Sequence, residues 1–150
     1  MLPADHVWRL LLAAGLGAAI GLEREYRQKP AGLRTNILIA VGSALFTIIS
    51  LEMTKGIGDT SRVAGQIVTG IGFLGGGAIM RNRSTVTGMT TAATIWVNAA
   101  IGVAAGMGLY QLAIATTGLT LIVLVILPPI EAYFEKRAGW PDRHILPPDS

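Results

Sequence analysis

Long uncharged, apolar stretches alternate with short charged segments along this chain. The longest runs from Ser84 to Ile130 without a single formal charge. As one helix it would extend about 70 Å at about 1.5 Å per residue, whereas the hydrocarbon core of a bilayer is about 30 Å thick. The stretch therefore predicts two membrane-spanning helices, separated near Gly106.

Three further uncharged stretches each begin directly after an arginine, and they cover residues 10–22, 35–51 and 63–80. With the divided stretch they predict an all-α integral membrane protein with five transmembrane helices. The predicted helices are about 7–22, 35–53, 63–80, 89–106 and 109–127. Because proline interrupts helical hydrogen bonding, Pro128 and Pro129 are expected to end the last helix. Residues 1–128 then form the transmembrane domain and 129–150 a cytoplasmic tail.

The composition agrees with a lipid environment. Hydrophobic residues make up 51% of the 150-residue chain and charged residues only 14%, against about 25% charged in a typical soluble domain. So few polar side chains cannot cover a water-facing surface, and the lipid bilayer is the expected partner. The chain contains no cysteine, which excludes disulfide and thiolate chemistry.

Basic residues are divided unequally between the two ends of the predicted bundle. Nine of the twelve lysines and arginines fall in segments 23–34 and 81–88 and in the tail. Because basic loops remain in the cytoplasm, the N-terminus is expected outside and the C-terminus in the cytoplasm. This topology accounts for the net charge of +3 without a nucleic-acid partner.

The segment TGIGFLGGGAIM contains Gly70, Gly72 and Gly75 in the G-x-G-x-x-G spacing of dinucleotide-binding loops. Such a loop needs a preceding strand and an acidic residue about twenty positions later. Here the next acidic residue after Asp59 is Glu131. Small residues also let helices approach closely in lipid. The pattern therefore favours helix packing, and no cofactor is expected.

Small and weakly polar residues form stripes on the third and fourth predicted helices. The candidate packing or polar-seam residues are Gly65, Gln66, Thr69, Gly70, Gly72, Gly75, Gly76, Thr90, Thr94, Asn98 and Gly102. Their spacing of three or four residues places most of each set on one helix face, and we expect the two faces to meet. Asn98 and Gln66 are amides in a hydrocarbon region, where unpaired polar groups are costly. They are expected either to bond across these helices or to mark an ion route.

Charged residues gather in GLEREYRQKPAGLRTN, residues 21–36. The candidates for a cytoplasmic charged face are Glu23, Arg24, Arg27 and Arg34. Glu23 and Arg27 have the spacing of a helical ion pair, so mutual pairing is the simplest interpretation. Binding of anionic lipid head groups, or of Mg²⁺ through Glu23 or Glu25, is the alternative. No histidine lies in an apolar stretch to activate a hydroxyl. We therefore expect no catalytic or dedicated metal-ligand residue.

Three blocks of the sequence resemble the MgtC/SapB family of membrane proteins. They are residues 21–36, RVAGQIVTGIGFLGGGAIM at 62–80 and TGMTTAATIWVNAAIG at 87–102. The resemblance covers about residues 7 to 127 and implies a multi-pass protein of the bacterial inner membrane. Members are linked to growth at low magnesium and to the survival of pathogens inside cells. Better-known members also carry a soluble cytosolic domain, so a short form without that domain is expected.

Two functions remain open at this point. The resemblance implies a non-enzymatic protein that modulates other membrane proteins or ion homeostasis, with its glycine-lined faces docking a partner helix or a second copy. The alternative is a transporter or channel that passes a cation such as Mg²⁺ or H⁺ along a seam containing Gln66 and Asn98. The middle of the predicted bundle has no carboxylate, which favours the first function.

Overall fold

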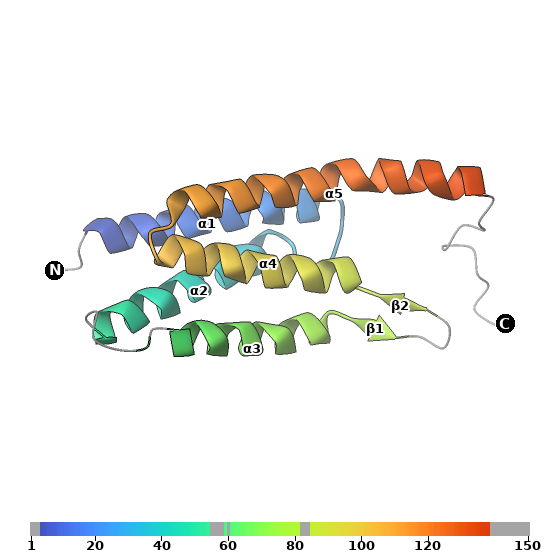
Figure 1. Ribbon diagram of the computed structural model, residues 1–150. Coiled ribbons are helices and arrows are strands. Elements are labelled where there is room, and N and C mark those ends of the chain that lie inside the picture. The colour runs from blue at the N-terminus through green and yellow to red at the C-terminus, as the bar shows by residue number, and fades with distance from the viewer. Residues whose placement is uncertain (1–3, 55–58, 60, 82–84, 139–150) are drawn as a thin grey trace.

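The computed structural model describes residues 4–54, 59, 61–81 and 85–138. In this part of the chain five helices run side by side, with a short β-hairpin at one end of the bundle (Figure 1). The helices are α1 (Ala4–Tyr26), α2 (Leu33–Thr54), α3 (Ser61–Gly77), α4 (Met89–Gly106) and α5 (Tyr110–Ala138). The protein is therefore helical, as the charge-free stretches predict.

Four helices of the described part, α1, α2, α4 and α5, are long and apolar enough to cross a membrane. The 17 residues of α3 extend about 26 Å, somewhat less than the about 30 Å of a hydrocarbon core. Length and composition thus make four of the expected spans candidates for crossing a membrane. A fifth span through α3, and the orientation of the bundle, remain predictions.

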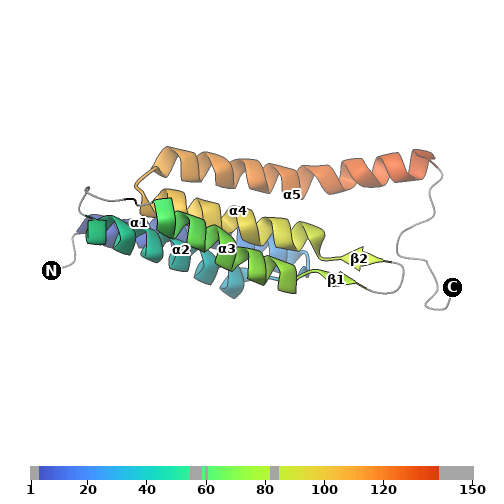
Figure 2. The same cartoon turned by 60° about the horizontal axis from the view of Figure 1, so that its bottom comes forward.

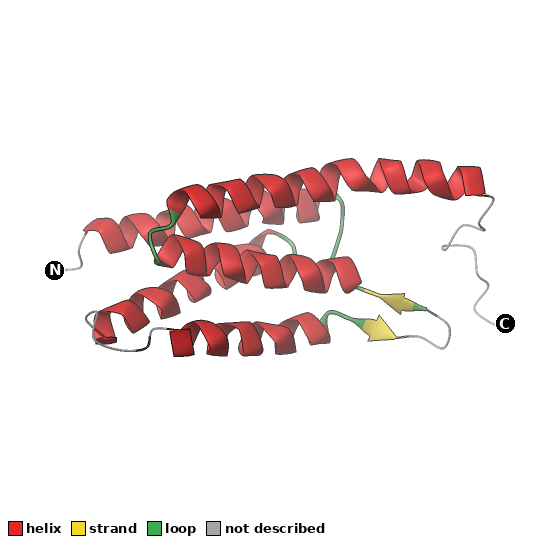
Figure 3. Cartoon of the chain, viewed as in Figure 1, coloured by secondary structure: helices red, strands yellow, loops and turns green. Residues whose placement is uncertain are grey.

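The connection between α3 and α4 differs from the expected helix end. Helix α3 ends at Gly77, and β1 (Met80–Arg81) pairs antiparallel with β2 (Val86–Thr87) (Figure 3). The prediction of a helix up to residue 80 was wrong because consecutive glycines weaken the end of α3. Gly88 then turns the chain into α4 with a φ of 88°, in the left-handed region that favours glycine.

Helix α5 continues past the two prolines, so its predicted end at residue 127 was also wrong. A proline in a helix lacks the N–H that would donate to the carbonyl four residues earlier. Pro129 therefore leaves the Val125 carbonyl without its helical donor. The Arg27 guanidinium donates a hydrogen bond to this carbonyl at 3.3 Å, which supplies one replacement partner where the ladder is broken.

The tightest packing joins α1, α2 and α4. The larger of two buried apolar clusters in the described part consists of Ala13, Ile20, Ala40, Ala44, Ile101, Ala104, Ala105, Ala113 and Leu124. Most of these side chains are small, so the helix backbones approach closely. Helix α5 packs on α1 and α4, whereas α3 packs on α4 and less extensively on α2. Figure 2 shows α5 along one side of the bundle, and Figure 1 shows α3 at the edge opposite α5.

Candidate functional site

Two buried amides join α4 to α2. The Nδ2 of Asn98 donates to the backbone carbonyl of Asn36 at 2.7 Å and to its Oδ1 at 3.1 Å. Both side chains are fully buried. In turn, the Nδ2 of Asn36 donates to the carbonyls of Ala31 and, at 3.0 Å, Gly32. The pair therefore ties the middle of α4 to the start of α2 and to the connection before it.

One acceptor atom of this amide pair receives no hydrogen bond from the described residues. The Oδ1 of Asn98 is buried and has no hydrogen-bond donor among the described residues. A buried carbonyl oxygen without a donor loses the free energy of its hydration. Asn98 is thus a structural contact that retains one unused polar atom.

Glycines let the backbones of α2 and α4 meet next to this pair. A Cβ added to Gly102 would overlap the Ala40 carbonyl and lie 2.9 Å from the Cβ of Ser43. A Cβ added to Gly106 would lie 2.6 Å from the Ala44 carbonyl oxygen. Real side-chain atoms do not fit at such distances, so these positions require glycine. The glycines of the α4 stripe are therefore covered by α2.

Helix α1 uses glycines in the same way. A Cβ added to Gly17 would lie 2.7 Å from the Asn36 carbonyl oxygen, and one added to Gly21 would lie 2.7 Å from the Cα of Leu33. The sequence analysis missed these two glycines and Asn36. The four-residue spacing of Gly17 and Gly21 is a signal of close helix contact that could have revealed the glycines.

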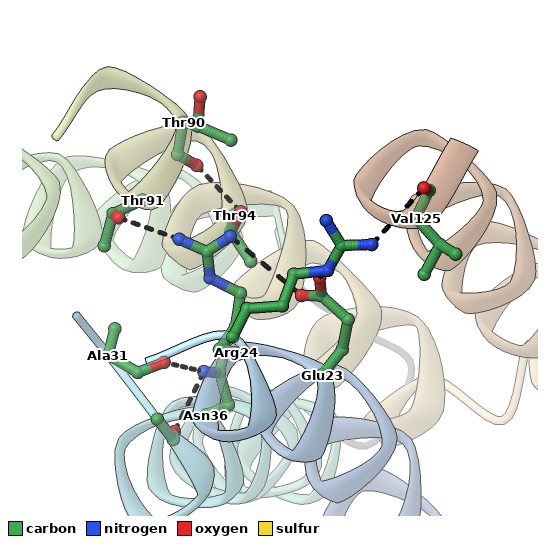
Figure 4. Close-up of polar contacts among 10 residues, drawn as sticks. Glu23, Arg24, Ala31, Asn36, Thr90, Thr91, Thr94 and Val125 are labelled. Atoms are coloured by element: carbon green, nitrogen blue, oxygen red, sulfur yellow. Dashed lines mark hydrogen bonds and ion pairs between the residues drawn. The ribbon is translucent and has the colours of Figure 1, made fainter. Parts of the chain in front are cut away.

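A second polar cluster lies where α1 meets α4 (Figure 4). The Arg24 side chain is buried, and its Nη2 donates to the Thr91 hydroxyl at 3.1 Å. Its Nη1 lies 3.9 Å from a carboxylate oxygen of Glu23. The expected ion pair between Glu23 and Arg27 is present, with 2.8 Å between the Arg27 Nε and a Glu23 oxygen. Glu23 is itself nearly buried, so this pair is a helix contact rather than an open charged surface.

The other residues of the charged segment do not join this cluster. Glu25 accepts a hydrogen bond from the backbone N–H of Leu33 at 3.0 Å, so it stabilises the first turn of α2. Arg34 is exposed on that turn and forms no ion pair with any residue the structure describes. The structure therefore groups Glu23, Arg24 and Arg27 and leaves Arg34 apart.

The stripe on α3 does not meet the stripe on α4. Gly65, Gly70, Gly72 and Gly76 are exposed, and an added Cβ would find no described atom within 4 Å. Only the neighbouring Gly75 is buried on α3, where its added Cβ would lie 3.6 Å from the Ala92 carbonyl oxygen. The expectation that the two stripes pack together was wrong because α2 already covers the α4 stripe.

The remaining seam residues are also separated. Gln66 is exposed and lines a groove between α3 and α2, so it does not pair with Asn98. The hydroxyls of Thr69 and Thr94 donate to carbonyls one turn earlier in their own helices, those of Gly65 and Thr90. The structure therefore does not assemble a single polar seam from Gln66 and Asn98.

The opposite end of the bundle has its own polar contacts. Arg9 donates to the Gly106 carbonyl at 2.8 Å, and the Tyr110 hydroxyl donates to Asp5 at 2.8 Å. A His6 nitrogen lies 3.3 Å from a carboxylate oxygen of Glu52. These contacts connect the start of α1 to α2 and to the junction of α4 and α5.

Close glycine contacts, buried amides and four candidate membrane-spanning helices are together typical of a multi-helix membrane protein. The model of the MgtC family matches residues 10–133, and the chain belongs to that family. The family predicted from the three sequence blocks is therefore confirmed.

Several curated proteins are similar over most of the chain. The putative magnesium transporter YhiD of Escherichia coli is 48% identical over 82% of this chain and 60% of its own length. Protein MgtC of Salmonella typhimurium is 46% identical over 91% of this chain and 62% of its own. An uncharacterized protein of Synechocystis is 44% identical over 89% of this chain and 56% of its own length. The chain thus spans about three fifths of the length of these relatives, and no solved structure matches it.

Proposed function

We propose that this chain is a non-enzymatic protein of the bacterial inner membrane that modulates another membrane protein or ion homeostasis when magnesium is limiting. Membership of the MgtC family supports the membrane location. The connection to magnesium is supported by the name of the Escherichia coli relative, a putative magnesium transporter.

The buried polar groups favour a modulator over a transporter, because they bond to one another across helices. Asn98 and Asn36 bond to each other, and Arg24 bonds to Thr91. These groups therefore hold helices together, whereas an ion route needs polar groups that face a continuous water-filled path. A rigid core of this kind leaves α3 to present an exposed glycine face to a partner helix or to a second copy.

A cation transporter is the second candidate. One specific observation favours it: the Oδ1 of Asn98 is buried and has no donor within the described part of the chain. Such an oxygen is a suitable ligand for a cation or for a water in a transport path. The position of Gln66 in a different groove argues against a path through both amides.

Reconstitution separates the two functions. The purified protein is placed in liposomes, and the entry of Mg²⁺ and H⁺ is followed with trapped fluorescent indicators. For a modulator we expect the ion flux of liposomes without protein. Expression of the same protein should nevertheless restore growth at low magnesium to a bacterium that lacks its own homologue. Mg²⁺ flux that Asn98→Leu abolishes in a folded protein would instead establish the transporter.

The docking role of α3 has a separate test. Gly72→Leu places a side chain in open space, so the variant is expected to fold normally and to lose growth rescue at low magnesium. Gly118→Leu on α5 is a matched control, because its added Cβ also meets no described atom within 4 Å. Full rescue by Gly72→Leu would contradict docking through this face.

A further inference from the structure

An apolar groove separates α3 from α2 along much of their length. Its volume is about 640 Å³, within the about 300–1,000 Å³ of typical ligand pockets. Leu38, Ile39 and Phe46 line it from α2, and Ile67, Ile71 and Leu74 line it from α3. The few polar groups in the lining include Ser43 and Gln66. The groove therefore suits a hydrocarbon ligand.

The length of the groove limits what can occupy it. Its lining runs from Thr35 to Phe46 on α2 and from Val63 to Leu74 on α3, which is about 17 Å of each helix. This is about half of the about 30 Å hydrocarbon core. A membrane-spanning helix of a second copy would extend well beyond it. One acyl chain, which occupies one leaflet, matches this length.

The surroundings of the groove also point to lipid. Helix α2 is one of the helices long and apolar enough to cross a membrane, and in a bilayer that α2 crosses the groove faces acyl chains. Lipid tails are as apolar as leucine side chains. An open groove of this lining is therefore filled by the tails that surround it.

Arg34 lies at the start of α2, next to Thr35 at the end of the groove. Arg34 precedes Leu38 by four residues and so lies on the same face of α2, one turn closer to the helix start. It is exposed and has no acidic partner in the described part of the chain. Glu25, the acidic residue closest to it in sequence, accepts from the Leu33 N–H instead. A guanidinium in this position can bind a phosphate through two parallel hydrogen bonds.

We propose that the α2–α3 groove holds one acyl chain of an anionic phospholipid, whose phosphate binds Arg34. The apolar lining selects the chain, and the Arg34 guanidinium selects the anionic head group. The lipid fills the space that the glycines Gly42 and Gly70 leave open in the two helices. It thereby completes the contact of α3 with the bundle.

Native mass spectrometry of the protein in mild detergent tests this binding. Dioleoyl phosphatidylglycerol is titrated against dioleoyl phosphatidylcholine, and bound lipid is counted on the intact protein. Gly42→Leu and Gly70→Leu each place a side chain at a glycine that lines the groove, where an added Cβ meets no described atom within 4 Å. Each is expected to weaken phosphatidylglycerol binding about tenfold, the effect of roughly two displaced methylene groups.

Gly118→Leu is the matched control, since Gly118 is equally open but lies on α5 away from this groove. It should bind lipid as the parent does, and the thermal unfolding of each variant shows whether it is folded. Arg34→Gln should keep acyl-chain binding and lose the preference for phosphatidylglycerol over phosphatidylcholine.

Three results would overturn the proposal. Equal lipid binding by Gly70→Leu, Gly42→Leu and Gly118→Leu would place the lipid elsewhere. A dimer that only the two groove variants disrupt, with lipid binding unchanged, would make a second copy the occupant. An unchanged preference of Arg34→Gln for phosphatidylglycerol would remove the head-group contact.

Discussion

Gly102 in α4 and Gly72 in α3 are both glycines within apolar helices, but their surroundings are opposite. At Gly102 the α2 backbone is so close that an added Cβ would overlap the Ala40 carbonyl. At Gly72 an added Cβ would meet no described atom within 4 Å. A glycine therefore shows only that a helix can be approached closely. Whether another helix of the same chain makes that approach depends on the tertiary arrangement.

The two regions also use their amides differently. Asn98 in α4 is fully buried and bonded to Asn36, whereas Gln66 in α3 is exposed in the groove. Helices α1, α2 and α4 thus form a core in which polar groups and glycines serve packing. Helix α3 packs on that core while most of its glycines contact no other described helix.

The largest expected effect on stability comes from a substitution in the core of α1, α2 and α4. Gly102→Leu forces a side chain against Ala40 and Ser43 and should lower the free energy of unfolding by about 3 kcal/mol, the upper end of typical overpacking costs. Gly72→Leu should not lower it, since that position is open. Thermal unfolding in detergent measures both. If the two variants unfold at the same temperature, the contrast between the regions does not exist.

Loss of the buried amide should have an intermediate effect. Asn98→Leu removes both hydrogen bonds to Asn36 and is expected to cost about 0.5–2 kcal/mol. Gln66→Leu should cost nothing measurable because Gln66 is exposed. Chemical unfolding in detergent compares the two. Equal costs would mean that both amides have similar environments.

The smallest expected effect has the opposite sign. Gly65→Ala and Gly76→Ala add a methyl group where no described atom lies within 4 Å, and alanine favours a helix by about 0.8–1 kcal/mol over glycine. Each variant should therefore stabilise α3, with slower hydrogen exchange in that helix. Faster exchange in α3 would indicate that these glycines contact something that the methyl group displaces.

The sequence predicts the five helices because long charge-free stretches mark them, although α1 and α5 extend through charged residues beyond the predicted bounds. The predicted helix at 89–106 has the observed bounds of α4. The burial of Asn98 agrees with its place in an apolar run, although Gln66 lies in another such run and is exposed. The hydrogen-bond partner of Asn98 cannot be predicted in this way. Helical periodicity indicates which residues share a face but gives no information on which helix covers that face. Gln66 was therefore expected where the structure has Asn36.

Two other features were beyond sequence reasoning for physical reasons. Pro128 and Pro129 normally end a helix, and α5 continues past them with Arg27, distant in sequence, bonded to the freed Val125 carbonyl. The burial of Arg24 likewise depends on Thr91 of another helix. Both are long-range contacts, so no local pattern indicates them.

Paired cysteines test most directly the central claim that α3 turns its glycine stripe away from the bundle. The chain has no cysteine of its own, so each pair reports without background. An added Cβ at Gly75 lies 3.8 Å from the Cβ of Ala92, close to the mean of about 3.8 Å in disulfides. Mild oxidation in membranes should therefore crosslink Gly75→Cys with Ala92→Cys, whereas Gly72→Cys or Gly76→Cys should not crosslink with Ala92→Cys. Crosslinking of Gly76→Cys in place of Gly75→Cys would contradict the account.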